Sequence, residues 1–264
     1  MRTGRSHPLS LQLTRYAAAR QPRHADPGLQ ISLVLRGRLV ERAGGGEERA
    51  GPLSLVVKAP GVEHADEYGP DVLIFRLAAE AESLVTLVDD VTVLPEWRWC
   101  HASLAVRPMV RLLQRFEAGV SLAGTDDPDV VELLAAVTPA VRRPGMPPAW
   151  LARVREQLDD EDGATRVGAI ASGAGVHPVY LARCFRAWYG TSVAGYLGRA
   201  RLQRAMGCLQ RSDLTLSRVA HLAGFSDQAH FGNRFREATG LNPGRFRRLI
   251  NALVGRGATP ISAA

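Results

Sequence analysis

Two short segments carry side chains suited to hydrogen bonding with the edges of nucleic-acid bases. The first segment contains Arg183 and Arg186, and the second contains Gln228 and Asn233. Arginine pairs with guanine through two hydrogen bonds, and the amides of glutamine and asparagine pair with adenine in the same way. The sequence shows no acid–base pair, no nucleophile beside a base and no phosphate-binding loop. It therefore predicts a binding protein and not an enzyme.

These two segments belong to a sequence repeat. The first copy reads IASGAGVHPVYLARCFRAWYGTSVAGYL, and the second reads VAHLAGFSDQAHFGNRFREATGLNPGRF. Glycine, phenylalanine and arginine recur in the same order, so that Gly175 matches Gly224 and Phe185 matches Phe235. Such a repeat indicates that one structural unit occurs twice.

Each copy predicts a helix-turn-helix unit. Thr165 and Thr215 are placed to cap the first helix of each unit. Gly175 and Gly224 can take the positive φ that a tight turn between helices requires, and Pro178 suits the first turn of the helix that follows. In such a unit the outward face of the second helix enters the major groove of DNA. The side chains predicted to face the bases are Val179, Ala182, Arg183, Arg186, Gln228, Ala229, Gly232 and Asn233.

The apolar residues of both copies are predicted to form the cores of the two units. Leu181 and Phe185 share one face of a predicted helix, as do Phe231 and Phe235, so these faces should point inward. His230 lies next to this face and is interpreted as a packing histidine. The aromatic residues assigned to the core, and not to base stacking, are Phe225, Phe231, Phe235 and Phe246.

One long helix is predicted between the two copies, from Ser192 to about Gln210. At about 1.5 Å per residue it would be close to 28 Å long. One turn of DNA is about 34 Å, so a helix of this length could hold both units in successive segments of the major groove. The arginines predicted to neutralise phosphates, without reading sequence, are Arg199, Arg201, Arg204, Arg245, Arg247 and Arg248.

Charge divides unevenly between the halves of the chain. Residues 1–148 carry 17 Lys and Arg against 18 Asp and Glu, whereas residues 149–264 carry 16 against 8, so the net +7 comes from the second half. The segment RRPGMPP, Arg142 to Pro148, is rich in proline and predicts a linker between the halves. The basic half either meets a polyanion or presents a solvated basic face, and charge alone leaves both interpretations open.

The first half predicts a β-rich domain followed by helices. Residues 29–36 alternate between apolar and polar side chains, which is typical of a half-buried strand, and Gly37 suits a hairpin turn. Further short strands are predicted at 53–58 and 72–77, with Pro-Gly and Gly-Pro breaks between them. This pattern indicates a sandwich or a small barrel. Two segments at helical spacing follow, 102–119 and 126–141, the second with Asp126 or Asp127 available as a cap.

Length and composition add three expectations. A chain of 264 residues is long enough for two domains. It has no run of eighteen apolar residues and no signal-peptide pattern at its start, so we expect a cytoplasmic protein. Three scattered cysteines, Cys100, Cys184 and Cys208, predict reduced thiols and no zinc or redox site.

The segment AGFSDQAHFGNRFREATGLNPGRFR resembles the signature of the AraC/XylS family of bacterial transcription regulators. The resemblance covers roughly residues 150–250. It implies a multidomain protein in which an all-β domain with helices, 1–141, and a linker, 142–148, precede an all-α domain of two helix-turn-helix units, 149–255. It also implies a ligand-responsive regulator that reads two successive major-groove segments of a promoter. The expected partners are double-stranded DNA, an unknown small-molecule effector, a second copy of the chain and RNA polymerase.

The first half resembles the cupin-like sensory barrels that often precede this DNA-binding module. The resemblance rests on RHADPGLQISLVLRGRLVE and APGVEHADEYGPDVLIFRL. It implies that His24 and His64 line an effector pocket, where a cupin would place metal ligands, with Asp26 or Glu63 as carboxylate partners. The set is incomplete because aspartate stands where a cupin has its second histidine. We therefore expect no metal and no cofactor.

Two other classes of function remain open from the sequence. A metal-dependent cupin enzyme with a DNA-binding tail would lose metal and activity when His24 or His64 is changed. A structural DNA-binding protein without sequence preference would bind any duplex equally. Polar Gln228 and Asn233 on an outward face argue against the second class, because amides there favour base readout.

Overall fold

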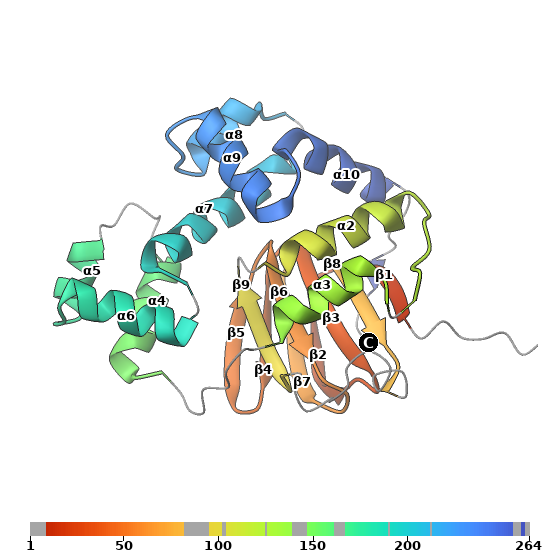
Figure 1. Cartoon of the computed structure of the whole chain (residues 1–264), viewed down its shortest axis with the longest axis horizontal. Coiled ribbons are helices and arrows are strands. Elements are labelled where there is room, and N and C mark those ends of the chain that lie inside the picture. Colours follow the sequence, from red (N-terminus) through yellow and green to blue (C-terminus); the bar gives the residue numbers. More distant parts are fainter. Residues whose placement is uncertain are drawn as a thin grey trace, which may run out of the picture. The chain divides into compact units, whose positions relative to one another are not determined.

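The computed structural model describes residues 9–81, 95–101, 104–124, 126–138, 147–160, 167–189, 191–211, 213–255 and 260–261. Contacts divide the chain into two compact units (Figure 1). The first unit combines residues 1–139 with 235–264, and the second comprises residues 140–234. Most of the predicted linker and Thr165 lie outside the described residues.

The strands of the first unit form two sheets. The larger sheet has the order β10-β1-β8-β3-β6-β9, and the smaller one has the order β2-β7-β4-β5. Among the strands that the structure describes, no ladder joins the two sheets, so the predicted closed barrel is not formed and the alternative of two stacked sheets fits better. The strands are β1 (Leu9–Tyr16), β2 (Ala19–Ala25), β3 (Leu29–Arg36), β4 (Leu39–Ala43), β5 (Gly46–Ala50), β6 (Ser54–Lys58), β7 (Glu63–Tyr68), β8 (Val72–Ala79), β9 (Trp97–His101) and β10 (Pro260–Ile261).

Strand β3 differs from its prediction in burial. Its alternating sequence predicted one solvent-exposed face, but all of its residues except Arg36 are buried, including Gln30 and Ser32. The strand lies between β8 and β6 in the sheet, and side chains on both of its faces are buried. Ser32 is satisfied because its hydroxyl accepts a hydrogen bond from Nε of Arg76 at 3.1 Å. The predicted turn at Gly37 is confirmed, with a φ of +77°.

Two helices lie over the six-stranded sheet in Figure 1. They are α2 (Val106–Glu117) and α3 (Pro128–Val137), and both fall within the segments predicted to be helical. Asp127 caps α3, since its carboxylate accepts a hydrogen bond from the backbone N–H of Asp129 at 3.1 Å. The ring of Phe116 on α2 packs on that of Phe75 on β8, with centroids 5.6 Å apart.

Among the residues described in the second half of the chain, all regular elements are helices, as predicted, apart from the two residues of β10. Its helices are α4 (Ala149–Asp160), α5 (Val167–Gly173), α6 (Pro178–Tyr189), α7 (Val193–Leu209), α8 (Leu216–Leu222), α9 (Gln228–Thr239) and α10 (Pro243–Gly255). Helix α9 runs across the boundary between the two units, and α10 belongs to the first. Within the first unit, α10 contacts α2, and β10 pairs in parallel with β1. No helix in the described ranges has the length and apolarity needed to cross a membrane.

Candidate nucleic-acid interface

Both predicted turns have the required backbone. Gly175, between α5 and α6, has a φ of +67°, and Gly224, between α8 and α9, has a φ of +81°. Residues with a Cβ rarely adopt this conformation, which accounts for glycine at both positions. The predicted cap at Thr215 is confirmed, because its hydroxyl accepts a hydrogen bond from the backbone N–H of Arg218 at 3.2 Å. Pro178 begins α6 as predicted.

The inner faces of α6 and α9 are buried as predicted. Leu181, Phe185, Phe231 and Phe235 are fully buried. The rings of Phe225 and Phe231 lie 5.3 Å apart, and that of Phe235 meets Phe246 edge to face at 5.4 Å. These ring contacts fix the rotation of α9 about its axis, and the burial of Leu181 and Phe185 does the same for α6, so the outward side chains of both helices are decided.

The side chains predicted to face the bases lie on the outer surface of the two helices, with one exception. Gly232 is half-buried, and it has no side chain to present. Val179 is 61 % exposed, an unusual value for a valine. The exposed members of the set are Val179, Ala182, Arg183 and Arg186 on α6, and Gln228, Ala229 and Asn233 on α9.

The structure adds two residues to these outer faces. Tyr180 is 53 % exposed, and its ring stacks on that of Trp150 with centroids 5.8 Å apart. His230, interpreted as a packing histidine, does meet Phe225 edge to face at 5.4 Å, but the residue is exposed. Each precedes a core position by one residue, so helical spacing alone left its orientation ambiguous.

Asp227 fixes the start of α9. Its carboxylate accepts a hydrogen bond from the backbone N–H of His230 at 2.7 Å, and another from the hydroxyl of Ser226 at 2.9 Å. These hydrogen bonds, the backbone one foremost, lower the pKa of Asp227 because they favour the charged carboxylate. A negative charge at the N-terminus of the helix is also favourable to its dipole.

The connecting helix forms as predicted, but its arginines are not equally accessible. Ser192 caps α7 by accepting a hydrogen bond from the backbone N–H of Gly195 at 3.0 Å. Arg199 is buried, with its guanidinium 4.0 Å from the centroid of the Tyr196 ring, so it is not placed to reach a phosphate and we remove it from the predicted set. Arg201, Arg204 and Arg247 are half-buried, whereas Arg245 and Arg248 are exposed.

His24 and His64 are brought together in the four-stranded sheet. They pair in register between β2 and β7, with ring centroids 4.2 Å apart. His64 is buried, and its Nε2 lies 2.7 Å from Nζ of Lys58. Burial, and next the charge of Lys58, lower the pKa of His64, because both disfavour the imidazolium.

The histidines belong to a buried polar cluster that the sequence analysis did not identify. Lys58 and Glu41 form an ion pair at 3.1 Å and both are buried. Burial raises the pKa of Glu41, whose carboxylate accepts hydrogen bonds from the indoles of Trp97 and Trp99. Asp66, also buried, accepts from the hydroxyl of Tyr68 at 2.8 Å. Alternation along β4, β6 and β7 could have placed these residues on inward faces, but strand pairing alone brings them together.

Asp26 and Glu63, the two carboxylates predicted as partners of the histidines, make different contacts. Oδ2 of Asp26 lies 3.6 Å from Nε2 of His64. Glu63 is exposed and forms a surface ion pair with Arg23 at 3.5 Å. Only Asp26 is therefore close to the cluster by the described contacts.

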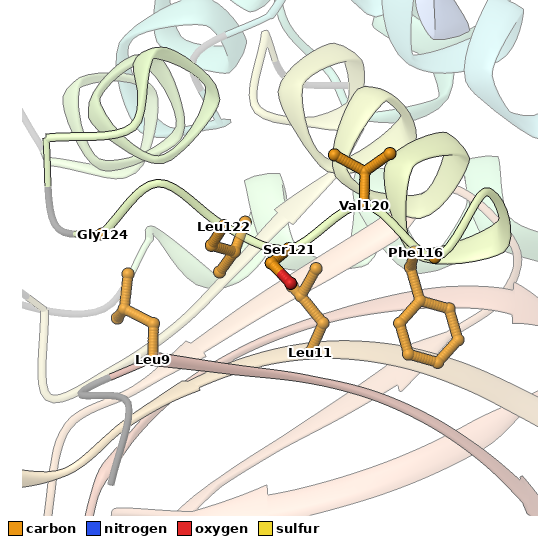
Figure 2. A pocket seen from close by; sticks show the side chains of 8 residues that line it. Leu9, Leu11, Phe116, Val120, Ser121, Leu122 and Gly124 are labelled. Atoms are coloured by element: carbon orange, nitrogen blue, oxygen red, sulfur yellow. The ribbon is translucent and has the colours of Figure 1, made fainter. Parts of the chain in front are cut away.

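A separate hollow of about 330 Å³ lies beside β1. Figure 2 shows Leu9, Leu11 and Phe116 on its sides, with Val120 and Leu122 on the segment that follows α2. None of its lining residues belongs to the histidine cluster. Its lining is mostly apolar, which would suit an apolar group.

A doubled helix-turn-helix with exposed polar residues on both second helices defines the class: a DNA-binding protein. The sequence model of a helix-turn-helix domain matches residues 170–249. The chain is 33 % identical over 125 residues to the HTH-type transcriptional regulator GlxA of Rhizobium meliloti, a match that covers 47 % of this chain and 32 % of GlxA. It is 31 % identical over 98 residues to the probable transcription factor PqrA of Proteus vulgaris, covering 37 % of this chain and 77 % of PqrA.

Solved structures show weaker likeness. ToxT from Vibrio cholerae is 7 % identical, with a TM-score of 0.38 over 92 % of this chain and 98 % of ToxT. The C-terminal domain of AraT from Geobacillus stearothermophilus is 24 % identical, with a TM-score of 0.36 over 39 % of this chain and 88 % of that domain. Both TM-scores are low.

The chain belongs to the AraC family of transcription regulators, because it matches PqrA over most of that relative's length. The chain matches a smaller share of two other relatives: 32 % of the length of GlxA and 28 % of the length of the transcriptional activator NphR of a Rhodococcus species. The helix-turn-helix model itself covers residues 170–249, which lie in the helical half of the chain.

Proposed function

We propose that this protein is a sequence-specific transcription regulator whose helices α6 and α9 enter two successive segments of the major groove. The observation that carries the proposal is that both helices bury their phenylalanines completely and expose the side chains that hydrogen-bond with bases. Helix α7, with 17 residues, is about 25 Å long at 1.5 Å per residue. That length is compatible with two contacts about one DNA turn apart.

The two units are proposed to read DNA differently. Helix α9 offers two amides, Gln228 and Asn233, which favour adenine. Helix α6 offers exposed Val179 and Ala182, which would contact thymine methyl groups, and Arg183, which favours guanine. The operator should therefore contain two unlike blocks of bases.

Selection of bound duplexes from a random pool by the full chain tests this proposal. We expect one enriched motif made of two blocks, about one DNA turn apart, and tighter binding of that motif than of random DNA at the same salt concentration. Binding without enrichment would reject sequence reading and leave a nonspecific, electrostatic DNA-binding protein.

Changes to base-facing residues should relax sequence preference. Arg183→Ala and Asn233→Ala are each expected to cost about 1 to 3 kcal/mol of binding to the selected motif, with little change in binding to random DNA. Competition titrations with both duplexes measure the ratio. An unchanged ratio would remove the substituted residue from the reading surface.

Changes to phosphate-facing residues should act on all DNA alike. Arg248→Ala, in the exposed part of α10, is expected to weaken selected and random duplexes equally and to reduce the salt slope of log K by about 1. Arg98→Ala removes the same charge from an exposed position on β9 and is the matched control. A loss confined to the selected motif would instead identify Arg248 as a base reader.

We also propose that the first unit binds a small effector and forms the homodimer, with RNA polymerase as a further partner on the promoter. His24 and His64 are the proposed effector-contacting residues, since they belong to a buried polar cluster that can orient a ligand. The apolar hollow near Leu11 is the second candidate binding site for the effector (Figure 2). Binding of the effector is measured in both variants. If it is lost in His24→Gln and retained in Leu11→Ala, the effector site is the one at the histidines.

A further inference from the structure

Three potential ligand atoms converge in the first unit. His24, His64 and Asp66 each offer one nitrogen or oxygen, and these atoms all lie within 4.8 Å of one another. His64 and Asp66 are two residues apart on β7, so their side chains share one face of the strand. His24 reaches them from the neighbouring strand β2, where it pairs with His64.

Backbone carbonyls fix the tautomer of both imidazoles. Nδ1 of His24 lies 2.9 Å from the carbonyl oxygen of Pro22, and Nδ1 of His64 lies 3.0 Å from that of Val62. A carbonyl oxygen can only accept, so each Nδ1 carries the hydrogen and donates it. In the neutral form of an imidazole held in this way, the lone pair is on Nε2. This is the arrangement in which a carbonyl orients a histidine that ligates a metal.

Asp66 contributes an oxygen that needs a partner. The residue is 5 % exposed, and its Oδ1 has no hydrogen-bond partner among the residues that the structure describes. Burying a carboxylate oxygen in this way is costly unless a donor or a cation contacts it. A cation bound by the Asp66 carboxylate would offset the cost of burying it.

The surrounding charges also favour a cation. Three carboxylates, those of Asp26, Glu41 and Asp66, lie around His64 and Lys58. In these contacts the one ammonium, that of Lys58, is set against three carboxyl groups, so the cluster offers a divalent cation more acidic partners than cationic ones. Lys58 now donates to Nε2 of His64 at 2.7 Å, and on releasing that nitrogen it would keep its ion pair with Glu41.

We propose that His24, His64 and Asp66 bind a divalent first-row transition-metal ion, which takes the place of the Lys58 ammonium at Nε2 of His64. Two imidazoles select such an ion over Mg²⁺ or Ca²⁺, which prefer oxygen ligands. The sequence predicted no metal because the second histidine of the cupin pattern is missing at Asp26. The structure supplies a carboxylate from β7 in its place. Three protein ligands leave a coordination position open to water or to a small ligand.

Equilibrium dialysis of the full chain, stripped with a chelator, against Zn²⁺ and then Co²⁺ tests the proposal. We expect one ion per chain and a visible ligand-field spectrum with Co²⁺. His24→Gln and Asp66→Asn are each expected to weaken binding at least about tenfold, since each removes one of three ligands. His177→Gln, an exposed histidine in the second unit, is the matched control and should bind as the unchanged chain does.

X-ray absorption of the zinc-loaded unchanged chain keeps the test independent of how the variants fold. It is expected to show two imidazole ligands and no sulfur. The proposal is overturned by no binding at micromolar metal, by sulfur ligation, or by one ion per chain that is retained in both ligand variants. The measurement uses no DNA, so its failure leaves the proposed reading of DNA standing, and the reverse also holds.

Discussion

Replacing Phe231 with alanine is expected to lower the free energy of unfolding around α8 and α9 by about 3 to 5 kcal/mol and to abolish DNA binding. Phe231 is fully buried, and its ring packs on that of Phe225. Removing the ring leaves a cavity and allows α9 to rotate about its axis. The base-facing side chains of α9 would then no longer be held toward the DNA. Hydrogen exchange of α8 and α9 in the full chain, together with a binding titration, measures both effects.

Leu222→Ala is the matched control for Phe231→Ala. Leu222 is an apolar residue of α8 that is 44 % exposed. Its truncation is expected to change the free energy of unfolding by no more than about 0.5 kcal/mol and to leave exchange in α9 unchanged. If Phe231→Ala behaved like this control, the inner face of α9 would be assigned incorrectly.

Replacing Lys58 with methionine is expected to lower the free energy of unfolding of the first unit by about 3 to 5 kcal/mol in the presence of a chelator. Methionine keeps most of the apolar stem but removes the ammonium. Glu41 is 2 % exposed and would lose the ammonium that pairs with it, so it must either stay ionised without that cation or take up a proton, and both cost free energy. Denaturant unfolding followed by tryptophan fluorescence suits the measurement, because Trp97 and Trp99 both contact Glu41.

The double variant Lys58→Met with Glu41→Gln separates charge from packing. The amide oxygen of glutamine can still accept hydrogen bonds from the two indoles, and the carboxylate that paired with Lys58 is gone. We therefore expect the double variant to recover most of the stability lost in Lys58→Met. A double variant as unstable as the single one would show that the packing of the Lys58 stem, and not its charge, stabilises the cluster.

The sequence by itself determined the helical half of the protein and the outward faces of α6 and α9. A period of 3.6 residues places Leu181 with Phe185, and Phe231 with Phe235, whatever the rest of the chain does. Glycine at 175 and 224 follows from the same local physics, since both positions have positive φ. Local geometry therefore accounts for the success of these predictions, while contact with DNA stays a prediction.

The tertiary structure alone decided the rest. Arg199 lies on a helix predicted correctly, yet its burial over Tyr196 depends on how α7 packs. Strand β3 loses its exposed face because other elements cover it. Glu41, Lys58 and Asp66 come from three strands, and only their pairing places them beside His64. Residues far apart in the chain meet through strand register and layer packing, and no local period in the sequence encodes these contacts.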